Sequence, residues 1–131
     1  MKILVVDDEK DTQMLFEQRF RKVIKTGEMI FDFVYSGEEA LTYLNHHFSE
    51  AILILSDINM PGMSGLELLR QIKNRSLSPA PVVMMITAYG DSENYNQAMN
   101  LGADDFLTKP LDFTILKEKL INKIHDKSIS S

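Results

Sequence analysis

The chain has 131 residues, no cysteine and a formal net charge of −5 at neutral pH. This length fits one compact domain, and the lack of cysteine excludes disulfides, thiolate zinc sites and thiol catalysis. The acidic balance gives no general attraction to nucleic acid or anionic membranes, and the apolar runs are too short to span a bilayer. Because the N-terminus also lacks a signal-peptide pattern, we expect a single cytoplasmic domain.

Short apolar segments alternate with helical patterns along the whole chain. Short uninterrupted runs of Val, Ile and Leu are typical of strands buried on both faces of a parallel sheet. The candidate strands are residues 3–6, 30–35, 52–55, 82–86 and 105–108. The second is interrupted by Asp32, which predicts an edge strand.

Apolar residues with a helical period fill the gaps between these strands. Their helical faces lie within residues 16–24, 40–48, 66–72, 95–99 and 113–124. Ser64 and Asp112 are candidate N-caps, while Gly27 and Gly102 mark helix ends. Five strands alternating with five helices predict an α/β fold: a doubly wound, flavodoxin-like parallel sheet in the order 2-1-3-4-5, with five flanking helices.

Polar side chains stand at the ends of four of these strands. They are Asp7, Asp8, Asp57, Thr87 and Lys109. On a parallel sheet these ends open onto one edge, where ligands bind at the point at which the winding reverses. Three carboxylates in one cleft repel each other unless a cation neutralises them, and an oxygen-only cluster suits Mg²⁺. A carboxylate beside Mg²⁺ and a lysine can accept a phosphoryl group, and a threonine hydroxyl can bond one of its oxygens.

Five segments carry a family pattern in the same order and at matching separations. They are residues 3–9 (ILVVDDE), 36–41 (SGEEAL), 57–65 (DINMPGMSG), 86–88 (ITA) and 102–110 (GADDFLTKP). In these segments the chain resembles the receiver domain of two-component response regulators, and the resemblance covers about residues 2–124. It implies a receiver domain over residues 1–125, with residues 126–131 as a tail or the start of a linker.

The resemblance implies a role for each matching residue. Asp57 is the expected phospho-acceptor, which takes a phosphoryl group from a sensor histidine kinase or a phosphotransfer protein. Asp8 and Asp57 are expected to bind Mg²⁺ (or Mn²⁺) directly, together with the backbone carbonyl of Asn59, whereas Asp7 acts through water. Lys109 is expected to contact the phosphoryl group.

The resemblance also implies a route by which phosphorylation is transmitted. Thr87 and Phe106 are expected to move together and to signal to the face formed by the fourth helix, the fifth strand and the fifth helix. The Lys109–Pro110 bond is expected to be cis, as it is in the family. Asn59 and Tyr89 border the expected path of the attacking water, so we expect them to tune the lifetime of the phosphoryl group.

The resulting hypothesis is a signalling switch that catalyses only its own phosphorylation and dephosphorylation. It is either a stand-alone relay or the receiver of a longer protein with a C-terminal effector domain. A receiver that binds partners without phosphate remains an alternative. An aspartyl-phosphate phosphatase would need an acid where Asn59 stands, and an FMN carrier would need a phosphate loop where Asp7, Asp8 and Glu9 stand. Three histidines, which could supply acid–base catalysis, fall on predicted helices away from the site: His46, His47 and His125.

Overall fold

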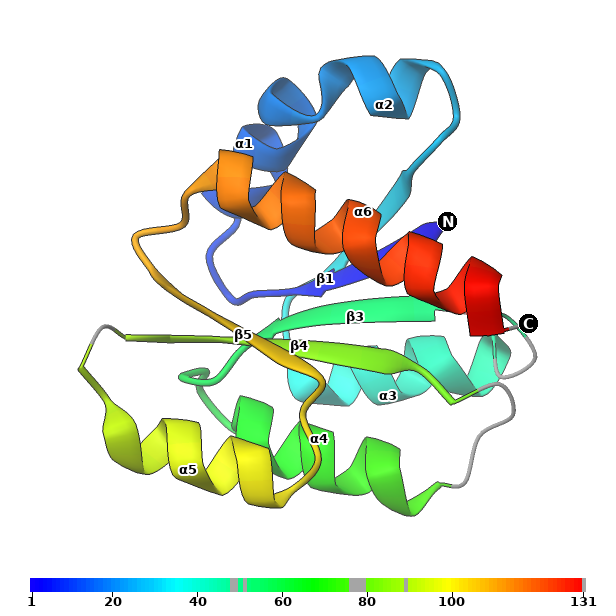
Figure 1. Cartoon of the computed structure of the whole chain (residues 1–131). Coiled ribbons are helices and arrows are strands. Elements are labelled where there is room, and N and C mark those ends of the chain that lie inside the picture. The colour runs from blue at the N-terminus through cyan, green and yellow to red at the C-terminus, as the bar shows by residue number, and fades with distance from the viewer. Residues whose placement is uncertain (48–49, 51, 76–79, 89, 131) are drawn as a thin grey trace.

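The computed structural model describes residues 1–47, 50, 52–75, 80–88 and 90–130, with the side chains of the last helix described as far as Lys123. The strands are β1 (Lys2–Val6), β2 (Ile30–Val34), β3 (Ile52–Asp57), β4 (Val82–Ala88) and β5 (Asp105–Lys109). They form one parallel sheet in the order β2-β1-β3-β4-β5, which confirms the predicted order (Figure 1). The winding therefore reverses between β1 and β3, whose carboxyl ends carry the three aspartates.

The described residues form six helices, one more than the sequence predicted. They are α1 (Asp11–Arg19), α2 (Arg21–Lys25), α3 (Gly37–His46), α4 (Gly65–Asn74), α5 (Ser92–Asn100) and α6 (Phe113–Ser130). The predicted first helix is divided at Phe20, where the backbone has φ −108° and ψ 19°. The Phe20 ring is buried and lies 5.0 Å from the Phe31 ring and 5.7 Å from the Phe16 ring. Packing of this ring against β2 therefore accompanies the break in the helix.

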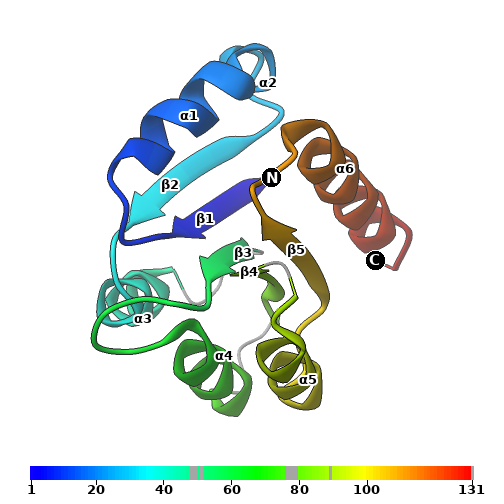
Figure 2. The ribbon, with the colours of Figure 1, turned by 90° about the vertical axis from the view of Figure 1, so that its left-hand side faces the viewer.

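The helices cover both faces of the sheet, as Figure 2 shows: α1, α2 and α6 on one face and α3, α4 and α5 on the other. Alternate residues of the central strands supply the two cores. In β1, for example, Leu4 and Val6 pack with α3 and α4, whereas Ile3 and Val5 pack with α1 and α6. Burial on both faces explains why these strands have continuous apolar sequences.

Local capping bonds fix where several helices begin and end. Ser64 accepts a hydrogen bond from the N–H of Glu67 at 3.2 Å, and Asp112 accepts one from Thr114 at 2.9 Å, so both predicted N-caps are confirmed. Gly102 follows α5 with φ +93°, a left-handed conformation that suits glycine at a helix end. Helix α6 includes residues 126–130, and a domain boundary at residue 125 stays a prediction. Across the described ranges, no helix combines the length and apolar character that crossing a membrane requires.

Candidate functional site

Three carboxylates meet at the sheet edge where the winding reverses. Asp7 and Asp8 follow β1 directly, and Asp57 is the last residue of the neighbouring strand β3. One carboxylate oxygen from each of the three residues lies within 4.8 Å of the others. Asp7 and Asp57 are buried and Asp8 is exposed, so the cluster opens to solvent on the Asp8 side.

Asp7 is fixed by two hydrogen bonds from the segment that follows it. The Glu9 backbone N–H donates to Asp7 Oδ1 at 2.9 Å, and the Thr12 hydroxyl donates to Asp7 Oδ2 at 3.1 Å. Burial, followed by the nearby charge of Asp57, raises the pKa of Asp7, although these hydrogen bonds and Lys109 partly oppose the rise. Asp7 is thus held rigidly in a place where its negative charge is unfavourable.

Lys109 supplies the positive charge at this edge from the end of β5. Its Nζ donates a hydrogen bond to Asp57 Oδ2 at 2.6 Å, and the Asp57 side chain is only 3% exposed. Burial alone would lower the pKa of Lys109, but the hydrogen bond and charge of Asp57, with the charges of Asp7 and Glu9, raise it. The Lys109–Pro110 peptide bond is cis, as the family resemblance implied.

Thr87 lies one strand further along, at the end of β4. It is 3% exposed, and its Oγ1 has no hydrogen-bond partner in the described part of the chain. A buried hydroxyl without a partner is unfavourable, which marks a place where an incoming acceptor oxygen would be stabilised. Thr87 and Phe106 line one cavity of about 250 Å³, and the Phe106 ring lies 4.5 Å from the Tyr95 ring.

The loop between β3 and α4 is held against the site from both ends. The Asn59 backbone N–H donates to Asp57 Oδ1 at 3.2 Å. Further along the loop, the Met63 N–H donates to Glu38 Oε1 of α3 at 3.0 Å. The loop that contains Asn59 is therefore tied both to Asp57 and to α3.

The structure brings together Asp7, Asp8, Asp57 and Lys109, and places Thr87 and Phe106 beside one shared cavity. Tyr89, predicted to tune the phosphoryl lifetime, lies outside the described residues. His46 and His47 are engaged elsewhere: His46 Nδ1 lies 2.9 Å from the Thr42 carbonyl oxygen, and His47 pairs with Glu50.

Two residues that contact the site were missed by sequence analysis. Thr12 bonds the carboxylate of Asp7, and Glu38 bonds the loop after Asp57. Thr12 stands five positions after Asp7 in the first turn of α1, a spacing that could have suggested it. Glu38 acts from 25 positions away, and no local pattern reports that contact.

This donor set fits a hard divalent cation. All three acidic ligands are oxygen donors within reach of one ion, and Mg²⁺ prefers oxygen ligands together with retained water. The exposed Asp8 leaves room for that water. The adjacent ammonium of Lys109 adds a second positive charge, so an anionic group placed at Asp57 would meet charge compensation from two sides.

The chain is similar to known proteins in both sequence and fold. The family described as "Response regulator receiver domain" matches residues 3–121. The response regulator RppA of Synechocystis sp. (strain ATCC 27184 / PCC 6803 / Kazusa) is 37% identical over 120 residues, which cover 92% of this chain and 49% of that protein. A cyclic di-GMP phosphodiesterase of Thermotoga maritima is 30% identical over 128 residues, which cover 97% of this chain and 32% of that protein.

Solved structures agree with the fold. The receiver domain of the TMAO respiratory system response regulator TorR superposes with a TM-score of 0.80 and 27% identity, over 95% of this chain and 97% of that one. The chain thus spans nearly all of that isolated domain. It spans only about half of RppA and about a third of the phosphodiesterase.

Proposed function

The chain belongs to the response regulator receiver domain family, whose general function is a phosphorylation switch in two-component signalling, and on that basis we propose that Asp57 is the phospho-acceptor. One observation carries the proposal. Asp57 is the buried carboxylate that both joins the acidic cluster and binds Lys109 at 2.6 Å. Phosphoryl transfer depends on such charge compensation around the acceptor.

The donor in this reaction is a phosphohistidine of a sensor kinase or a phosphotransfer protein. A carboxylate oxygen of Asp57 attacks the phosphorus, and the P–O bond forms as the P–N bond breaks. The imidazole nitrogen keeps the electron pair of the broken bond. The Lys109 ammonium, which is hydrogen-bonded to Asp57 before transfer, neutralises negative charge on the phosphoryl oxygens afterwards.

Asp8 and Asp57 would hold Mg²⁺, or Mn²⁺, through carboxylate oxygens, together with the backbone carbonyl of Asn59. Asp7 would act through bound water, since its two oxygens already accept hydrogen bonds from Glu9 and Thr12. When bound, the cation would supply positive charge in addition to that of Lys109 and would so stabilise the transferring group. The mutual proximity of the three carboxylates supports this assignment.

Thr87 and Phe106 would carry the signal outward. An acceptor oxygen at Asp57 would give the Thr87 hydroxyl, which has no partner in the described chain, a hydrogen-bond partner, and movement of Thr87 would change the cavity that it shares with Phe106. Phe106 packs against Tyr95 of α5, so the change reaches the face formed by α5, β5 and α6. Asn59 and Tyr89 would then set how long the phosphoryl group survives.

The phosphodonor would dock beside the acidic cluster. A cleft of about 550 Å³ opens there, lined by Asp7 and Lys109 together with apolar side chains that include Leu15 and Phe113. The neighbouring Met14 on α1 is 60% exposed and Leu15 is 46% exposed, so both can contact a partner. RppA and the phosphodiesterase are about two and three times as long as this chain, so a C-terminal effector domain in a longer protein is part of the proposal.

The experiment is the intact mass of the protein after incubation with acetyl phosphate. We expect a gain of one phosphoryl group that requires Mg²⁺, disappears in Asp57→Ala and persists in Asp11→Asn, an exposed carboxylate outside the cluster. No gain by the wild-type protein would favour the alternative, a receiver that binds its partner without phosphate. A gain that persists in Asp57→Ala would assign the acceptor to another residue.

A further inference from the structure

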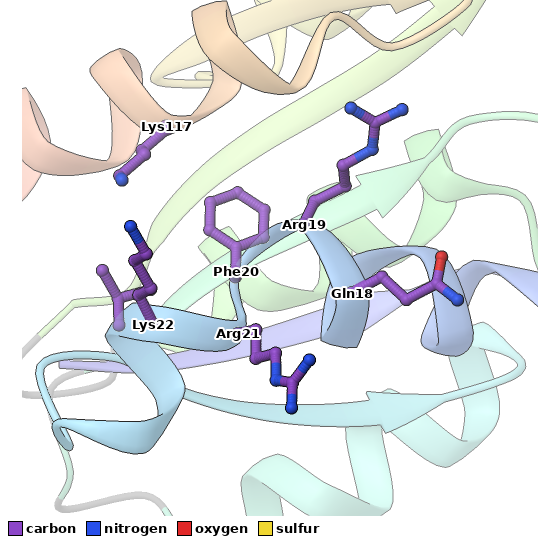
Figure 3. A pocket seen from close by; sticks show the side chains of 7 residues that line it. Gln18, Arg19, Phe20, Arg21, Lys22 and Lys117 are labelled. Carbon is purple, nitrogen blue, oxygen red and sulfur yellow. The ribbon is translucent and has the colours of Figure 1, made fainter.

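A second site lies on the α1, α2 and α6 side of the molecule, where the first helix is interrupted. A cleft of about 270 Å³ opens between the α1–α2 junction and α6. Four of its lining residues are cations, and we name it the basic cleft: Arg19, Arg21, Lys22 and Lys117 (Figure 3). Phe20 and Val23 also line it and form its apolar floor. We propose that the basic cleft binds a small phosphorylated anion.

The first argument is the absence of compensating charge. Elsewhere in the described chain, five cations form ion pairs with carboxylates, namely Lys2, Arg70, Lys73, Lys109 and Lys119, whereas Lys10, Lys25, Arg75 and Lys123 form none. Among the described residues, none of the four cations of the basic cleft forms one. The basic cleft therefore gathers four cations without an ion pair on one surface of a protein whose net charge is −5.

The second argument is the orientation of the side chains. Lys22 of α2 and Lys117 of α6 point toward one another across the cleft in Figure 3, while the Arg19 and Arg21 side chains extend away from this pair in different directions. Like charges that face each other are unfavourable, and an anion placed between them relieves the repulsion. The Arg19 guanidinium lies over the Phe113 ring, 5.5 Å from its centroid, and this contact holds it at the edge of the cleft.

The shape of the cleft selects the class of ligand. Its volume of about 270 Å³ is large enough for a phosphoryl or diphosphoryl group with a small substituent. Phe20 is 2% exposed and Val23 is 8% exposed, so the floor is closed and apolar while the rim is cationic. Arginine and lysine are the side chains that bind phosphate oxygens most strongly. The acidic remainder of the chain would repel a long polyanion that extends past the rim.

This inference does not depend on phosphorylation of Asp57, because no lining residue of the basic cleft belongs to the acidic cluster. The test is a titration of the ¹⁵N-labelled protein with sodium pyrophosphate, followed by NMR. Divalent cations are omitted because pyrophosphate chelates them, and a sodium chloride titration matches the ionic strength. We expect saturable shifts at the amides of Arg21, Lys22 and Lys117, and no saturable change with chloride.

Two double variants decide whether the cleft itself is responsible. Lys22→Gln/Lys117→Gln should weaken pyrophosphate binding at least about tenfold, because both facing ammonium groups are lost. Lys25→Gln/Lys123→Gln makes the same change of charge on the same two helices outside the cleft, and should change binding less than about twofold. The NMR spectrum of each free variant reports whether it is folded.

Three results would overturn the proposal. Chemical shifts that change linearly with pyrophosphate concentration, without saturation, would indicate general charge screening. Equal weakening of pyrophosphate binding in both double variants would show that net charge alone is responsible. Binding of a single-stranded oligonucleotide, with no saturable response to pyrophosphate, would assign the surface to nucleic acid instead.

Discussion

Gly65, the first residue of α4, lies directly against the backbone of Asp57 at the end of β3. A Cβ atom on Gly65 would lie 2.1 Å from the Asp57 carbonyl oxygen and 2.7 Å from the Cα atom of Ile58. The Gly65 N–H also donates to the Ile58 carbonyl oxygen at 2.8 Å. The absence of a side chain at Gly65 therefore allows α4 to close on the strand that carries the proposed phospho-acceptor.

We expect Gly65→Ala to lower the free energy of unfolding by about 3 kcal/mol, because Asp57 and Ile58 cannot move away from the new Cβ atom without disturbing their pairing with β4. The measurement is the midpoint of urea denaturation. Gly27→Ala is the matched control: Gly27 has φ +80° but open space around its Cβ position, so only backbone strain of about 1 kcal/mol is expected. Equal losses in the two variants would show that contact with Asp57 is unimportant.

Glu38 is expected to act as a positioning residue for the loop after Asp57. Its carboxylate accepts the Met63 N–H at 3.0 Å, and α3 packs against the same loop at Gly37, where a Cβ would lie 2.8 Å from Met63 Sδ. Glu38→Ala frees this end of the loop that contains Asn59. We expect the dissociation constant for Mg²⁺, measured by calorimetry, to rise about tenfold.

Two further variants separate positioning from charge. Glu38→Gln keeps an acceptor for Met63 and should retain most of the affinity for Mg²⁺. Glu118→Ala removes an exposed carboxylate from α6 and should leave that affinity unchanged. If Glu38→Gln weakens Mg²⁺ binding as much as Glu38→Ala does, the effect is electrostatic and the positioning role is wrong.

The sheet order and the acidic cluster were predictable because both follow from strand patterns and from the geometry of strand ends. The interruption at Phe20 was not, because the apolar period continues through it and the ring contacts with Phe31 arise only in the folded protein. The helical period also grouped Tyr95 and Met99 with Ala98, yet only Ala98 is buried, while Tyr95 is 45% and Met99 is 47% exposed. The buried face of α5 is therefore narrower than the apolar period indicates, because the period does not show how many of these residues the sheet covers.

The raised pKa of Asp7 gives a dependence of stability on pH. The pKa of Asp7 is higher in the folded state than its unfolded value of 3.8. Its stabilising contribution to the free energy of unfolding is therefore fully present below the unfolded pKa, and it is lost as the pH rises through the folded pKa. Ionised Asp7 therefore destabilises the fold at neutral pH. Without Mg²⁺, we expect Asp7→Asn to be more stable than wild type at pH ~7 by about 1 kcal/mol.

The same measurement at low pH provides the control. Below pH ~4 both proteins carry a neutral group at this position, so the difference in the free energy of unfolding should shrink toward zero. Asp11→Asn, a change at an exposed carboxylate, should show no comparable gain at neutral pH. A constant difference between Asp7→Asn and wild type at every pH would mean that packing, not ionisation, explains the effect.

Thr87 and Thr12 should respond in opposite directions to the same substitution. Thr87→Val removes a buried hydroxyl that has no partner in the described chain and keeps the shape of the side chain, so we expect a gain of about 1 kcal/mol in the free energy of unfolding. Thr12→Val removes the hydroxyl that donates to Asp7 Oδ2 at 3.1 Å, and should lower the free energy of unfolding by about 1 kcal/mol. Urea denaturation measures both changes.

If the Thr87 hydroxyl bonds the phosphoryl group, Thr87→Val should also reduce the NMR shift of Phe106 on addition of acetyl phosphate and Mg²⁺. A full shift at Phe106 in Thr87→Val would remove Thr87 from the proposed relay.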